Sequence, residues 1–276
     1  MESIKVMVNG LPGKVSTKVA EHIAKEPGLT LLPFALTGPE ISDKTVQIDS
    51  RSVQLTTPKE RNTLIDTLKS EEGAFICVDF THPTAVNDNA DFYRKHELPF
   101  VMGTTGGDRQ KLTDTIEASN ICAVIAPNMA KQIVAFQAMM AYAAETFPGM
   151  FNGYRLEVKE SHQKGKADTS GTAKAMIEHF NKLGTPFSKE QIVMERDPEV
   201  QKAEWGVPEE YLDGHGWHTY TLRSEDGTVF FQFTHNVNGR DIYARGTIDA
   251  ITYLQEKLTQ GAGGRVFSMI DVLKGT

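Results

Sequence analysis

Apolar residues in the first half of the chain fall into short runs separated by helically spaced positions. The runs at residues 4–8, 29–36, 75–80, 98–102 and 121–125 have the composition of buried strands. Val15, Val19 and Ile23 recur at helical spacing, and residues 84–95 and 108–118 are predicted to form two further helices. Strands that alternate with helices are typical of βαβ units. The first half therefore predicts a mostly parallel sheet.

The pattern changes after residue 130. Residues 130–147 form an apolar-rich helix candidate that is stopped by Pro148-Gly149. From Tyr154 onward apolar and charged residues alternate, as in a strand with one buried face. Two later apolar runs, at 217–224 and 229–236, flank an Asp-Gly pair that signals a hairpin. The second half therefore predicts a mostly antiparallel or mixed sheet, followed by a helix at 244–258.

Together the two halves predict an α/β protein with a Rossmann-like dinucleotide-binding domain and a second domain of the α+β type. A chain of 276 residues is long enough for two domains, and 39% hydrophobic with 24% charged residues is a globular composition.

Charge and hydropathy narrow the class of partner. The formal net charge is −7 and no long Lys or Arg block is present, which argues against a nucleic-acid-binding surface. No apolar run approaches the length of a membrane span, and a strand begins almost at once, so no signal or transit peptide is expected at this end. Earlier removal of a targeting segment stays open. Cys77 and Cys122 lie far apart in apolar runs and predict buried thiols.

A glycine-containing turn follows the first predicted strand. Gly10, Leu11, Pro12, Gly13, Lys14 and Val15 stand where a dinucleotide-binding fold has its phosphate turn. Glycines there let the backbone approach a pyrophosphate, and the next helix offers free amides at its N-terminus. The third glycine of the usual fingerprint is missing, so an ordinary tight turn is the alternative interpretation.

Other strand ends supply further cofactor-binding candidates, because ligands of open α/β sheets bind beyond the carboxyl ends of the strands. These candidates are Thr37, Phe80, Thr81, Gly103, Thr104, Thr105, Ala126, Pro127, Asn128 and Met129. Residues 36–39 contain no acidic residue, whereas an NAD-specific fold places one there for the ribose 2′-hydroxyl. NADPH is therefore permitted, since Lys14 and Lys18 on the first predicted helix could meet its 2′-phosphate, and it is the expected cofactor with NADH as the alternative. Simple turn chemistry is the competing interpretation of these loops.

The densest group of candidate catalytic residues lies between residues 160 and 172. Ser170 or Thr169 is a natural N-cap for a helix predicted at 173–183, which leaves the amides of Gly171 and Thr172 to hold a carboxylate. Lys166 precedes this helix start, and His162 ends the strand before it. A cation beside an anion-binding helix start suits a charged small substrate, and a Lys or His can also deliver a proton. Helix capping and a solvated loop are the alternatives for each residue taken alone.

His215 and His218 raise the alternative of a metal hydrolase. No third ligand stands at a telling spacing from this pair. Both histidines are interpreted as ordinary polar residues near the hairpin, and no metal is expected.

The same residues resemble a known family. The run Glu160-Ser161-His162-Gln163, continued by Lys166, Asp168 and Ser170-Gly171-Thr172-Ala173, is similar to the signature of dihydrodipicolinate reductases, most closely their plant-type branch. The loops at 10–15, 103–106 and 126–129 resemble the family's nucleotide turn, its nicotinamide-side loop and its interdomain segment. His235-Asn236 and Gly239-Arg240 resemble its late substrate-domain strand.

The resemblance implies NAD(P)H-dependent reduction of a cyclic dicarboxylate, 4-hydroxy-tetrahydrodipicolinate, to tetrahydrodipicolinate in the diaminopimelate pathway of lysine biosynthesis. It implies that His162 is the catalytic acid/base and Lys166 the proton donor. The residues implied to bind the substrate are Gln163, Ser170, Gly171, Thr172 and Arg240.

The resemblance also implies a domain organisation. Residues 1–129 and 243–276 would form the dinucleotide-binding domain, and residues 130–242 the domain for substrate binding and oligomerisation. Family members are homo-oligomers, so a dimer or a tetramer is expected. The location would be cytoplasmic in a bacterium, and the plastid stroma in a plant or alga after removal of a transit peptide.

Two departures from the common pattern keep other functions open. Gln163 stands where bacterial relatives have a second histidine, and it can bind a carboxylate but cannot carry charge. Ser16 replaces the usual last glycine of the nucleotide turn. Another two-domain NAD(P)-dependent reductase and a non-catalytic dinucleotide-binding sensor are therefore the alternative functions.

Overall fold

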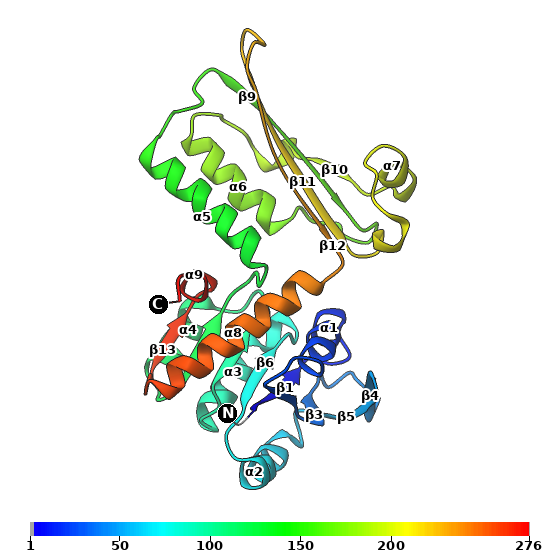
Figure 1. Cartoon of the computed structure of the whole chain (residues 1–276), viewed down its shortest axis with the longest axis vertical. Coiled ribbons are helices and arrows are strands. Elements are labelled where there is room, and N and C mark those ends of the chain that lie inside the picture. The colour runs from blue at the N-terminus through cyan, green and yellow to red at the C-terminus, as the bar shows by residue number, and fades with distance from the viewer. Residues whose placement is uncertain (1–2, 276) are drawn as a thin grey trace. The chain divides into compact units, whose positions relative to one another are not determined.

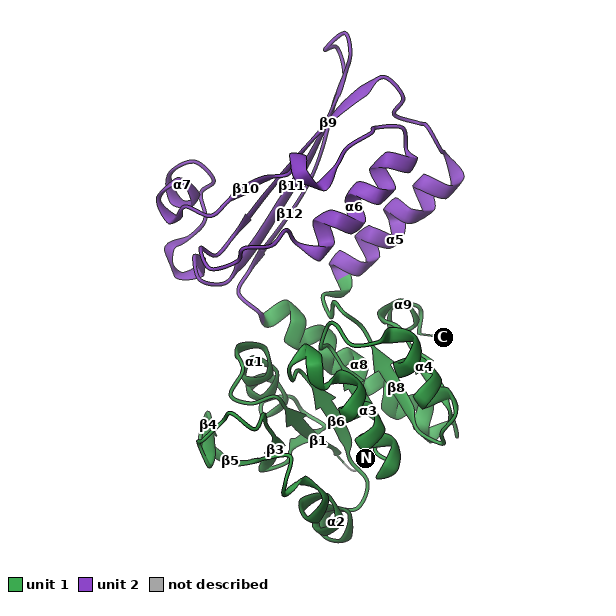
Figure 2. Ribbon diagram, turned by 180° about the vertical axis from the view of Figure 1, so that it is seen from behind, with its two compact units in different colours: residues 1–131, 241–276 green, residues 132–240 purple. Residues whose placement is uncertain are grey.

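The computed structural model describes residues 3–275, and the chain divides into two compact units. Figure 1 follows the chain from end to end, and Figure 2 colours the two units separately. Unit 1 comprises Met1–Lys131 and Asp241–Thr276, and unit 2 comprises Gln132–Arg240. No helix within the described residues is long and apolar enough to cross a membrane.

Unit 1 is built on a six-stranded parallel sheet of order β13-β8-β7-β6-β1-β2. Its strands are β1 (Ile4–Asn9), β2 (Leu29–Leu31), β6 (Ile76–Asp79), β7 (Phe100–Met102), β8 (Cys122–Ile125) and β13 (Arg265–Phe267). Every residue of β6 and β7 is buried, which is why these strands read as continuous apolar runs rather than as alternating ones. Both cysteines are free and buried in this sheet, as predicted.

Helices surround this sheet. They are α1 (Lys14–Ile23), α2 (Arg61–Glu72), α3 (Val86–Lys95), α4 (Arg109–Glu117), α8 (Asp241–Thr259) and α9 (Met269–Lys274), with a short 3-10 turn η1 at Pro83–Ala85. The apolar core joins side chains from the central strands to α3, among them Met7, Cys77, Tyr93 and Phe100. This packing fixes the strand ends on which the predicted cofactor loops stand.

The predicted strand at 29–36 is wrong in one respect, because the structure divides it into β2 and β3 (Phe34–Leu36). Pro33 lies between them and has no amide hydrogen to donate to a sheet. Its carbonyl instead accepts a hydrogen bond from the amide of Gln54, at 2.9 Å. The chain thereby leaves the large sheet, and β3 joins β4 (Thr45–Ile48) and β5 (Arg51–Thr56) in a separate sheet of order β3-β5-β4.

Unit 2 contains a four-stranded sheet of order β10-β9-β11-β12. Its strands are β9 (Tyr154–His162), β10 (Val193–Glu195), β11 (His215–Ser224) and β12 (Phe230–Asn238). The long strands are antiparallel, whereas β10 runs parallel to β9, so the sheet is mixed. The predicted fold class is thus confirmed.

The helices of unit 2 pack on one face of this sheet. They are α5 (Lys131–Thr146) and α6 (Gly171–Lys182), and the short elements η2 (Lys189–Gln191), α7 (Pro198–Ala203) and η3 (Glu209–Tyr211) connect β10 to its neighbours. Val158 and Tyr220 from the sheet meet Met176 and Phe180 from α6 in a fully buried core. That core holds the strand ends and the start of α6 in place.

Candidate functional site

A cavity of about 770 Å³ opens in unit 1 beyond the ends of β1, β3 and β6. The predicted cofactor residues that line it are Gly10, Leu11, Pro12, Gly13, Thr37, Phe80 and Thr81. Its position agrees with the rule that open α/β sheets bind ligands beyond the carboxyl ends of their strands.

The turn after β1 requires glycine at its first position. Gly10 has φ +94°, and a Cβ there would lie 2.3 Å from the carbonyl oxygen of Phe80. The Ser16 hydroxyl lies within hydrogen-bond distance of two carbonyl oxygens to which it can donate, that of Gly10 at 2.8 Å and that of Gly13 at 2.9 Å. No side chain in the described part of the chain caps α1 at Gly13, so the first amides of this helix remain available to an anion. The cradle therefore fits the diphosphate of a dinucleotide.

Asp79 organises the loops around this cavity, although the sequence analysis missed it. It ends β6 and is fully buried. Its Oδ1 accepts hydrogen bonds from the amide and hydroxyl of Thr81, at 3.0 and 2.7 Å, and from the Thr104 hydroxyl at 2.8 Å. Its Oδ2 accepts from the Tyr93 hydroxyl at 2.7 Å and from Asn89 at 3.0 Å. A charged residue that ends a buried strand was the available signal.

The remaining predicted cofactor residues do not line this cavity. Gly103, Thr104 and Thr105 follow β7, and Ala126, Pro127, Asn128 and Met129 follow β8, so they extend the same edge of the sheet. Gly103 lies against the Phe80 ring, where a Cβ would come within 2.1 Å of Cε1. Lys14 and Val15 start α1 outside the cavity wall.

Two charged residues that the sequence analysis did not single out line the cavity. Glu40 folds back toward Gly38. A Cβ added to Gly38 would lie 2.2 Å from Oε1 of Glu40. Arg61, at the start of α2, stacks over the Phe92 ring at 4.3 Å and donates to Asn89 at 3.2 Å. Lys18 instead pairs with Glu21. Glu40 and Arg61 are therefore the charges that a bound adenosine group would meet.

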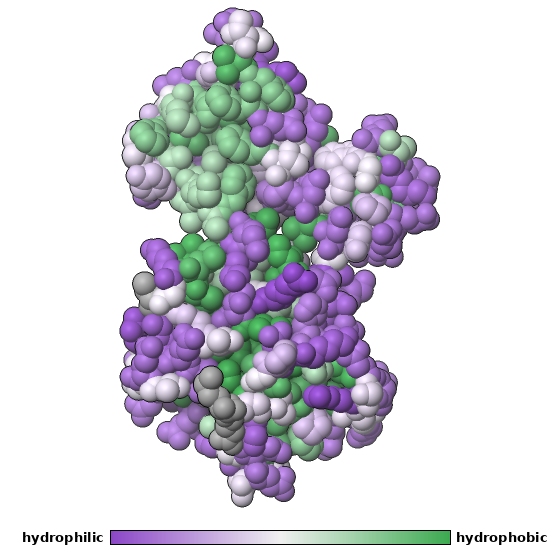
Figure 3. All heavy atoms as spheres, in the orientation of Figure 1, coloured by the Kyte–Doolittle hydropathy of each residue, from purple (hydrophilic) through white to green (hydrophobic). Residues whose placement is uncertain are grey.

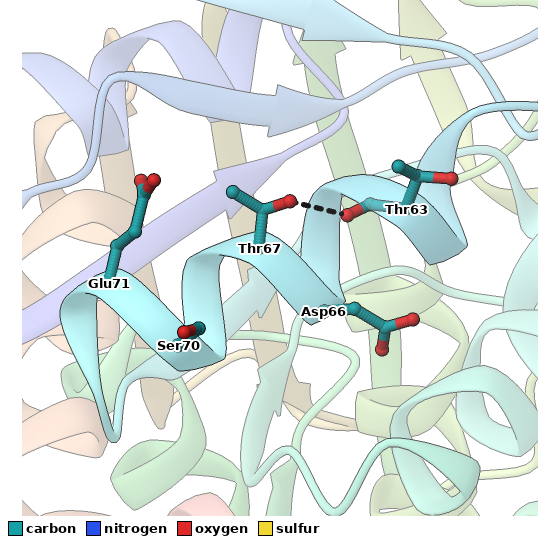
Figure 4. A pocket seen from close by; sticks show the side chains of 5 residues that line it. All are labelled: Thr63, Asp66, Thr67, Ser70 and Glu71. Carbon is teal, nitrogen blue, oxygen red and sulfur yellow. Dashed lines mark hydrogen bonds between the residues drawn. The ribbon is translucent and has the colours of Figure 1, made fainter.

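A second hollow lies on the outer side of α2 (Figure 4). It is lined by Thr63, Asp66, Thr67, Ser70 and Glu71, all from this one helix. The Thr67 hydroxyl donates to the carbonyl of Thr63, as in an ordinary helix turn. Figure 4 draws side chains from this one helix, and the Asp66 carboxylate already lies 3.5 Å from Nδ1 of His96, so we do not treat the hollow as a candidate site.

In unit 2 a polar row crosses the sheet face that packs on the helices. His218 on β11 lies directly opposite Glu160 on β9 and His235 on β12. Glu160 is fully buried, and His218 is 4% exposed. His162 lies two residues beyond Glu160 on the same face of β9, 9% exposed. The predicted catalytic histidine thus belongs to a cluster of buried titratable groups.

Glu160 is the most connected member of this cluster. Its Oε1 accepts from Nη2 of Arg196 at 2.5 Å, and its Oε2 accepts from the Ser170 amide at 3.1 Å. The same Oε2 lies 4.0 Å from Nε2 of His162 and 3.8 Å from Nε2 of His218. A buried carboxylate needs such partners, because desolvation of an unpaired charge is costly.

His162 has one satisfied ring nitrogen and one free one. Because its Nδ1 lies 3.1 Å from the carbonyl oxygen of His215, that nitrogen carries the proton and donates it. Nε2 has no hydrogen-bond partner among the residues that the structure describes. Burial lowers the pKa of His162 to about 4, although the Glu160 carboxylate opposes this shift. His162 is therefore neutral at pH 7, with Nε2 ready to accept a proton.

The loop after β9 presents Lys166, whose ammonium makes no hydrogen bond or ion pair with the described residues. Its amide donates to the carbonyl of Gln163 at 3.0 Å, and its own carbonyl accepts from Nε of Arg196 at 2.9 Å. The charge of Lys166 is close enough to lower the pKa of His162 further. Lys166 and His162 therefore lie within electrostatic reach of each other.

The start of α6 corrects one expectation. Ser170 caps the helix by accepting a hydrogen bond from the Thr172 amide at 3.2 Å, so that amide is not free for a carboxylate. Among residues 3–275, the Gly171 amide and the Thr172 hydroxyl have no partner. A Cβ on Gly171 would meet no atom within 4 Å, which leaves open space in front of this helix start.

Arg240 and Gln163 are not joined to the Glu160 cluster by any hydrogen bond that the described residues make. The Arg240 guanidinium lies against Gly214, where a Cβ would come within 2.8 Å of Nη1. Both side chains are partly exposed and carry unused donors.

The metal-binding alternative based on His215 and His218 does not fit. His215 donates from Nδ1 to the carbonyl of Tyr211 at 3.1 Å and accepts from the Ser161 hydroxyl at Nε2, at 2.7 Å. A different set, Glu160, His162 and His218, brings three ligand atoms within 4.8 Å of one another. Arg196 and the Ser170 amide already occupy its carboxylate, so we assign this set as a carboxylate–imidazole cluster.

Comparisons with known proteins agree with this geometry. Two family models match, described as dihydrodipicolinate reductase, N-terminus, over residues 4–129 and dihydrodipicolinate reductase, C-terminus, over residues 132–273. A probable 4-hydroxy-tetrahydrodipicolinate reductase 1, chloroplastic, of Oryza sativa subsp. japonica is 48% identical over 99% of this chain and 79% of the rice protein. The chloroplastic 4-hydroxy-tetrahydrodipicolinate reductase 2 of Arabidopsis thaliana is 47% identical over 98% of this chain and 77% of that protein.

A solved structure has a similar fold. A dipicolinate-bound dihydrodipicolinate reductase from Paenisporosarcina sp. TG-14 matches with a TM-score of 0.66. The sequence identity is 20%, and the match covers 96% of this chain and 97% of the other.

Proposed function

The chain belongs to the dihydrodipicolinate reductase family, and on this premise we propose that His162, Lys166 and the start of α6 form its substrate site. The protein is an NAD(P)H-dependent oxidoreductase. It reduces 4-hydroxy-tetrahydrodipicolinate to tetrahydrodipicolinate in the diaminopimelate pathway of lysine biosynthesis.

The observation that carries the substrate site is a set of unused donors and acceptors in unit 2. The Lys166 ammonium, Nε2 of His162 and the Gly171 amide have no hydrogen-bond partner within residues 3–275. Arg196 holds Lys166 through its backbone carbonyl, and the His215 carbonyl holds His162 through Nδ1. Gly171 starts α6, which Ser170 caps by accepting from the Thr172 amide. Such groups match a cyclic dicarboxylate that carries two negative charges and must gain a proton.

Conversion of 4-hydroxy-tetrahydrodipicolinate to tetrahydrodipicolinate requires loss of the 4-hydroxyl group as water and the addition of a hydride and a proton. When bound, the reduced nicotinamide supplies the hydride. Lys166 donates the proton to the carbon that becomes electron-rich. His162 is neutral at pH 7, so it assists as an acceptor at Nε2 and takes up a proton when the dianion is bound beside it.

The substrate carboxylates are bound by groups from three segments. The Gly171 amide and the Thr172 hydroxyl hold one carboxylate at the N-terminus of α6, where the helix dipole favours negative charge. Arg240 and Gln163 hold the other with their unused donors. Ser170 contributes as the cap that orients this helix start.

We propose NADPH as the preferred cofactor, with NADH accepted. Arg61 lines the cavity and carries the positive charge that a 2′-phosphate needs. Glu40 lines the same cavity and can accept a hydrogen bond from a ribose 2′-hydroxyl, as acidic residues do in NAD-binding folds. The presence of both charges favours dual use of cofactors.

We also propose that unit 2 forms a homo-oligomer, either a dimer or a tetramer. β12 is an edge strand and exposes Phe230 by 49% and Phe231 by 43%. Apolar surface also gathers over α5, where Met139 is 68% exposed (Figure 3). Exposed apolar patches and free strand edges are normally covered in soluble proteins. Sedimentation analysis of the purified protein tests this assembly, and a monomer at micromolar concentration would contradict it.

The names of the Oryza and Arabidopsis relatives support a plastid location for this chain. Imaging of a fluorescent fusion in plant cells, together with a chloroplast marker, tests this proposal.

A coupled assay tests the proposed function. Pyruvate and aspartate semialdehyde are condensed enzymatically to generate the substrate, and oxidation of NADPH or NADH is followed by absorbance. We expect turnover with both cofactors and a higher kcat/KM with NADPH. Binding of NADPH without turnover would instead support the sensor alternative, and turnover only with other carbonyl substrates would support a different reductase.

A further inference from the structure

We propose that Arg196 is a positioning residue of the substrate site, which acts through Glu160 and through the backbone of Lys166. This inference rests on the proposed function of His162 and Lys166. Arg196 lies more than twenty residues beyond the loop that it holds, in a polar segment that follows β10.

All three guanidinium nitrogens of Arg196 donate hydrogen bonds. Nη2 donates to Oε1 of Glu160 at 2.5 Å, Nε to the carbonyl of Lys166 at 2.9 Å, and Nη1 to the carbonyl of Glu195 at 2.9 Å. The planar fork of the guanidinium fixes these three acceptors relative to one another, which a point charge cannot do. Arg196 therefore connects β9, the loop after β9 and its own segment.

The sheet supports this connection. Glu195, the neighbour of Arg196, is paired with Ser161 on β9. Gln201 at the next helix donates to the carbonyl of His162 at 2.7 Å. The segment that carries Arg196 is therefore attached on both sides to the end of β9.

Glu160 extends the connection to the other end of the loop. Its second oxygen accepts from the Ser170 amide, one residue before α6 begins. Because Glu160 is fully buried, the Arg196 guanidinium also supplies the positive charge that this carboxylate needs. The Arg196–Glu160 pair thus holds the Lys166 carbonyl in the middle of the loop and the Ser170 amide at its end.

The loop has little structure of its own. Residues 163–170 form no helix or strand, and half of them are exposed. Within the loop, the backbone bond that the described residues make is the one from Lys166 to the carbonyl of Gln163. Gly165 adds conformational freedom in this stretch, with no atom within 4 Å of a Cβ built there. The position of the Lys166 ammonium therefore depends on the contact from Arg196.

A positioning role predicts a specific kinetic signature. Misplacement of a proton donor by about 1 Å costs about a hundredfold in rate. We expect Arg196→Lys and Arg196→Ala to lower kcat for the dicarboxylate by about tenfold to a hundredfold. The dissociation constant for NADPH should stay within about twofold, because every contact of Arg196 lies in unit 2. Arg196→Lys keeps the positive charge but loses the planar fork of donors. Its kcat should therefore be close to that of Arg196→Ala, whereas its stability should be closer to that of the wild type.

The experiment compares these variants with a matched control and a rescue. Lys202→Gln removes an exposed ion pair to Glu209 at 3.7 Å in the same segment, and it should leave kcat and the melting temperature unchanged. Millimolar guanidinium should restore kcat of Arg196→Ala, but not of Glu160→Gln, where the acceptor of the charge is lost. Glu160→Gln combined with Arg196→Ala should be no slower than the slower single variant.

Each outcome bears on the proposal. Full kcat in folded Arg196→Lys, or equal losses of kcat and NADPH affinity, overturns it, and so does an additive double variant. If Arg196→Ala does not fold, the kcat values and NADPH dissociation constants of Arg196→Lys and Glu160→Gln still test the proposal. Failure of the wild-type protein to reduce the dicarboxylate refutes the proposed function instead. Slow His162→Gln and Lys166→Ala variants beside an unaffected Arg196→Lys refute this inference alone.

Discussion

Gly216 leaves the space that the ring of His162 occupies. The two residues lie opposite each other on β11 and β9, and a Cβ on Gly216 would come within 3.0 Å of Cε1 and 3.4 Å of Nδ1 of His162. The backbone of Gly216 has no positive φ, so the requirement is for space and not for a special conformation. Nδ1 is the nitrogen that donates to His215, which makes the position of this ring sensitive to its neighbour.

Gly216→Ala should therefore displace the His162 ring by a few tenths of an ångström and lengthen its hydrogen bond to His215. We expect kcat to fall by up to about tenfold while NADPH affinity stays unchanged, because small displacements of catalytic groups are costly. Steady-state kinetics and NADPH titration measure the two quantities. Thr219→Ala, on the opposite face of the same strand, is the control. Full turnover of Gly216→Ala would show that the ring position is tolerant.

Lys166→Ala should lower kcat by about 10²- to 10⁴-fold, since it removes the proposed proton donor. NADPH affinity should change little. His162→Gln should also slow the chemical step, because Gln cannot accept a proton at the free nitrogen. Single-turnover measurements separate chemistry from product release. An unchanged turnover number in Lys166→Ala removes it as the donor, and full activity of His162→Gln across the pH range removes His162 from the mechanism.

The buried histidines of unit 2 should make the protein acid-sensitive. Burial lowers the pKa values of His162 and His235 to about 4, and that of His218 well below its ordinary value of 6.5. The unfolded chain binds these protons below pH 6.5, whereas the folded protein does not. Above pH 6.5 these histidines therefore do not lower the free energy of unfolding. As pH falls toward 4 the free energy of unfolding decreases, by about 3 kcal/mol for His162.

Urea unfolding between pH 4 and pH 8 measures this dependence. Replacement of His218 by Asn, which does not titrate in this range, should flatten the curve between pH 4 and pH 6.5. Equal slopes in the wild type and His218→Asn would show that this buried group does not contribute.

Cofactor choice should respond to the two charges in the unit 1 cavity. Arg61→Met should lower kcat/KM for NADPH by about tenfold or more and leave NADH nearly unchanged, because it removes a charge-assisted contact to the 2′-phosphate. Glu40→Gln should act in the opposite direction, with improved use of NADPH. Lys18→Met is the control, since Lys18 pairs with Glu21. Equal effects of Arg61→Met on both cofactors would argue that Arg61 contacts a part that they share.

Asp79→Asn should weaken cofactor binding. The Asp79 carboxylate accepts five hydrogen bonds through its two oxygens. In the Asn variant an NH₂ group would replace one of these oxygens, and as a donor it could not accept from the groups that face it. The loops that carry Thr81 and Thr104 would lose their anchor. We expect the dissociation constant for NADPH to rise by about tenfold, as for a lost hydrogen bond to a charged group. Fluorescence titration measures it, and an unaltered dissociation constant would contradict the assignment.

Local patterns in the sequence predicted the elements that are regular over many residues. The buried run at β6 and the alternation at β9 are confirmed, because burial on two faces or on one face imposes those patterns. The separation of β2 from β3 was missed, although Pro33 was visible, because the competing partner β5 comes some twenty residues later. Short strands such as β10 carry too few residues for a period to emerge.

The candidate site shows the same division. His162, Lys166 and Ser170 lie within nine residues, so their chemistry could be read from one segment. Arg196 and Asp79 could not be identified in this way. Arg196 stands in a polar stretch that has the composition of a surface loop, and only the pairing of β10 with β9 brings it to Glu160. The number of donors around Asp79 depends on three segments meeting at one strand end.

The division of unit 1 between both ends of the chain has a consequence for biosynthesis. Its second segment, Asp241–Thr276, supplies β13 at the edge of the sheet and α8, which contacts α1. Unit 2 is one continuous segment of the chain, so its residues leave the ribosome before those of α8 and β13. Since domains generally fold as units during synthesis, the substrate-binding unit can form first. The nucleotide-binding unit is therefore completed after the substrate-binding unit, because its sheet lacks an edge strand until β13 has emerged.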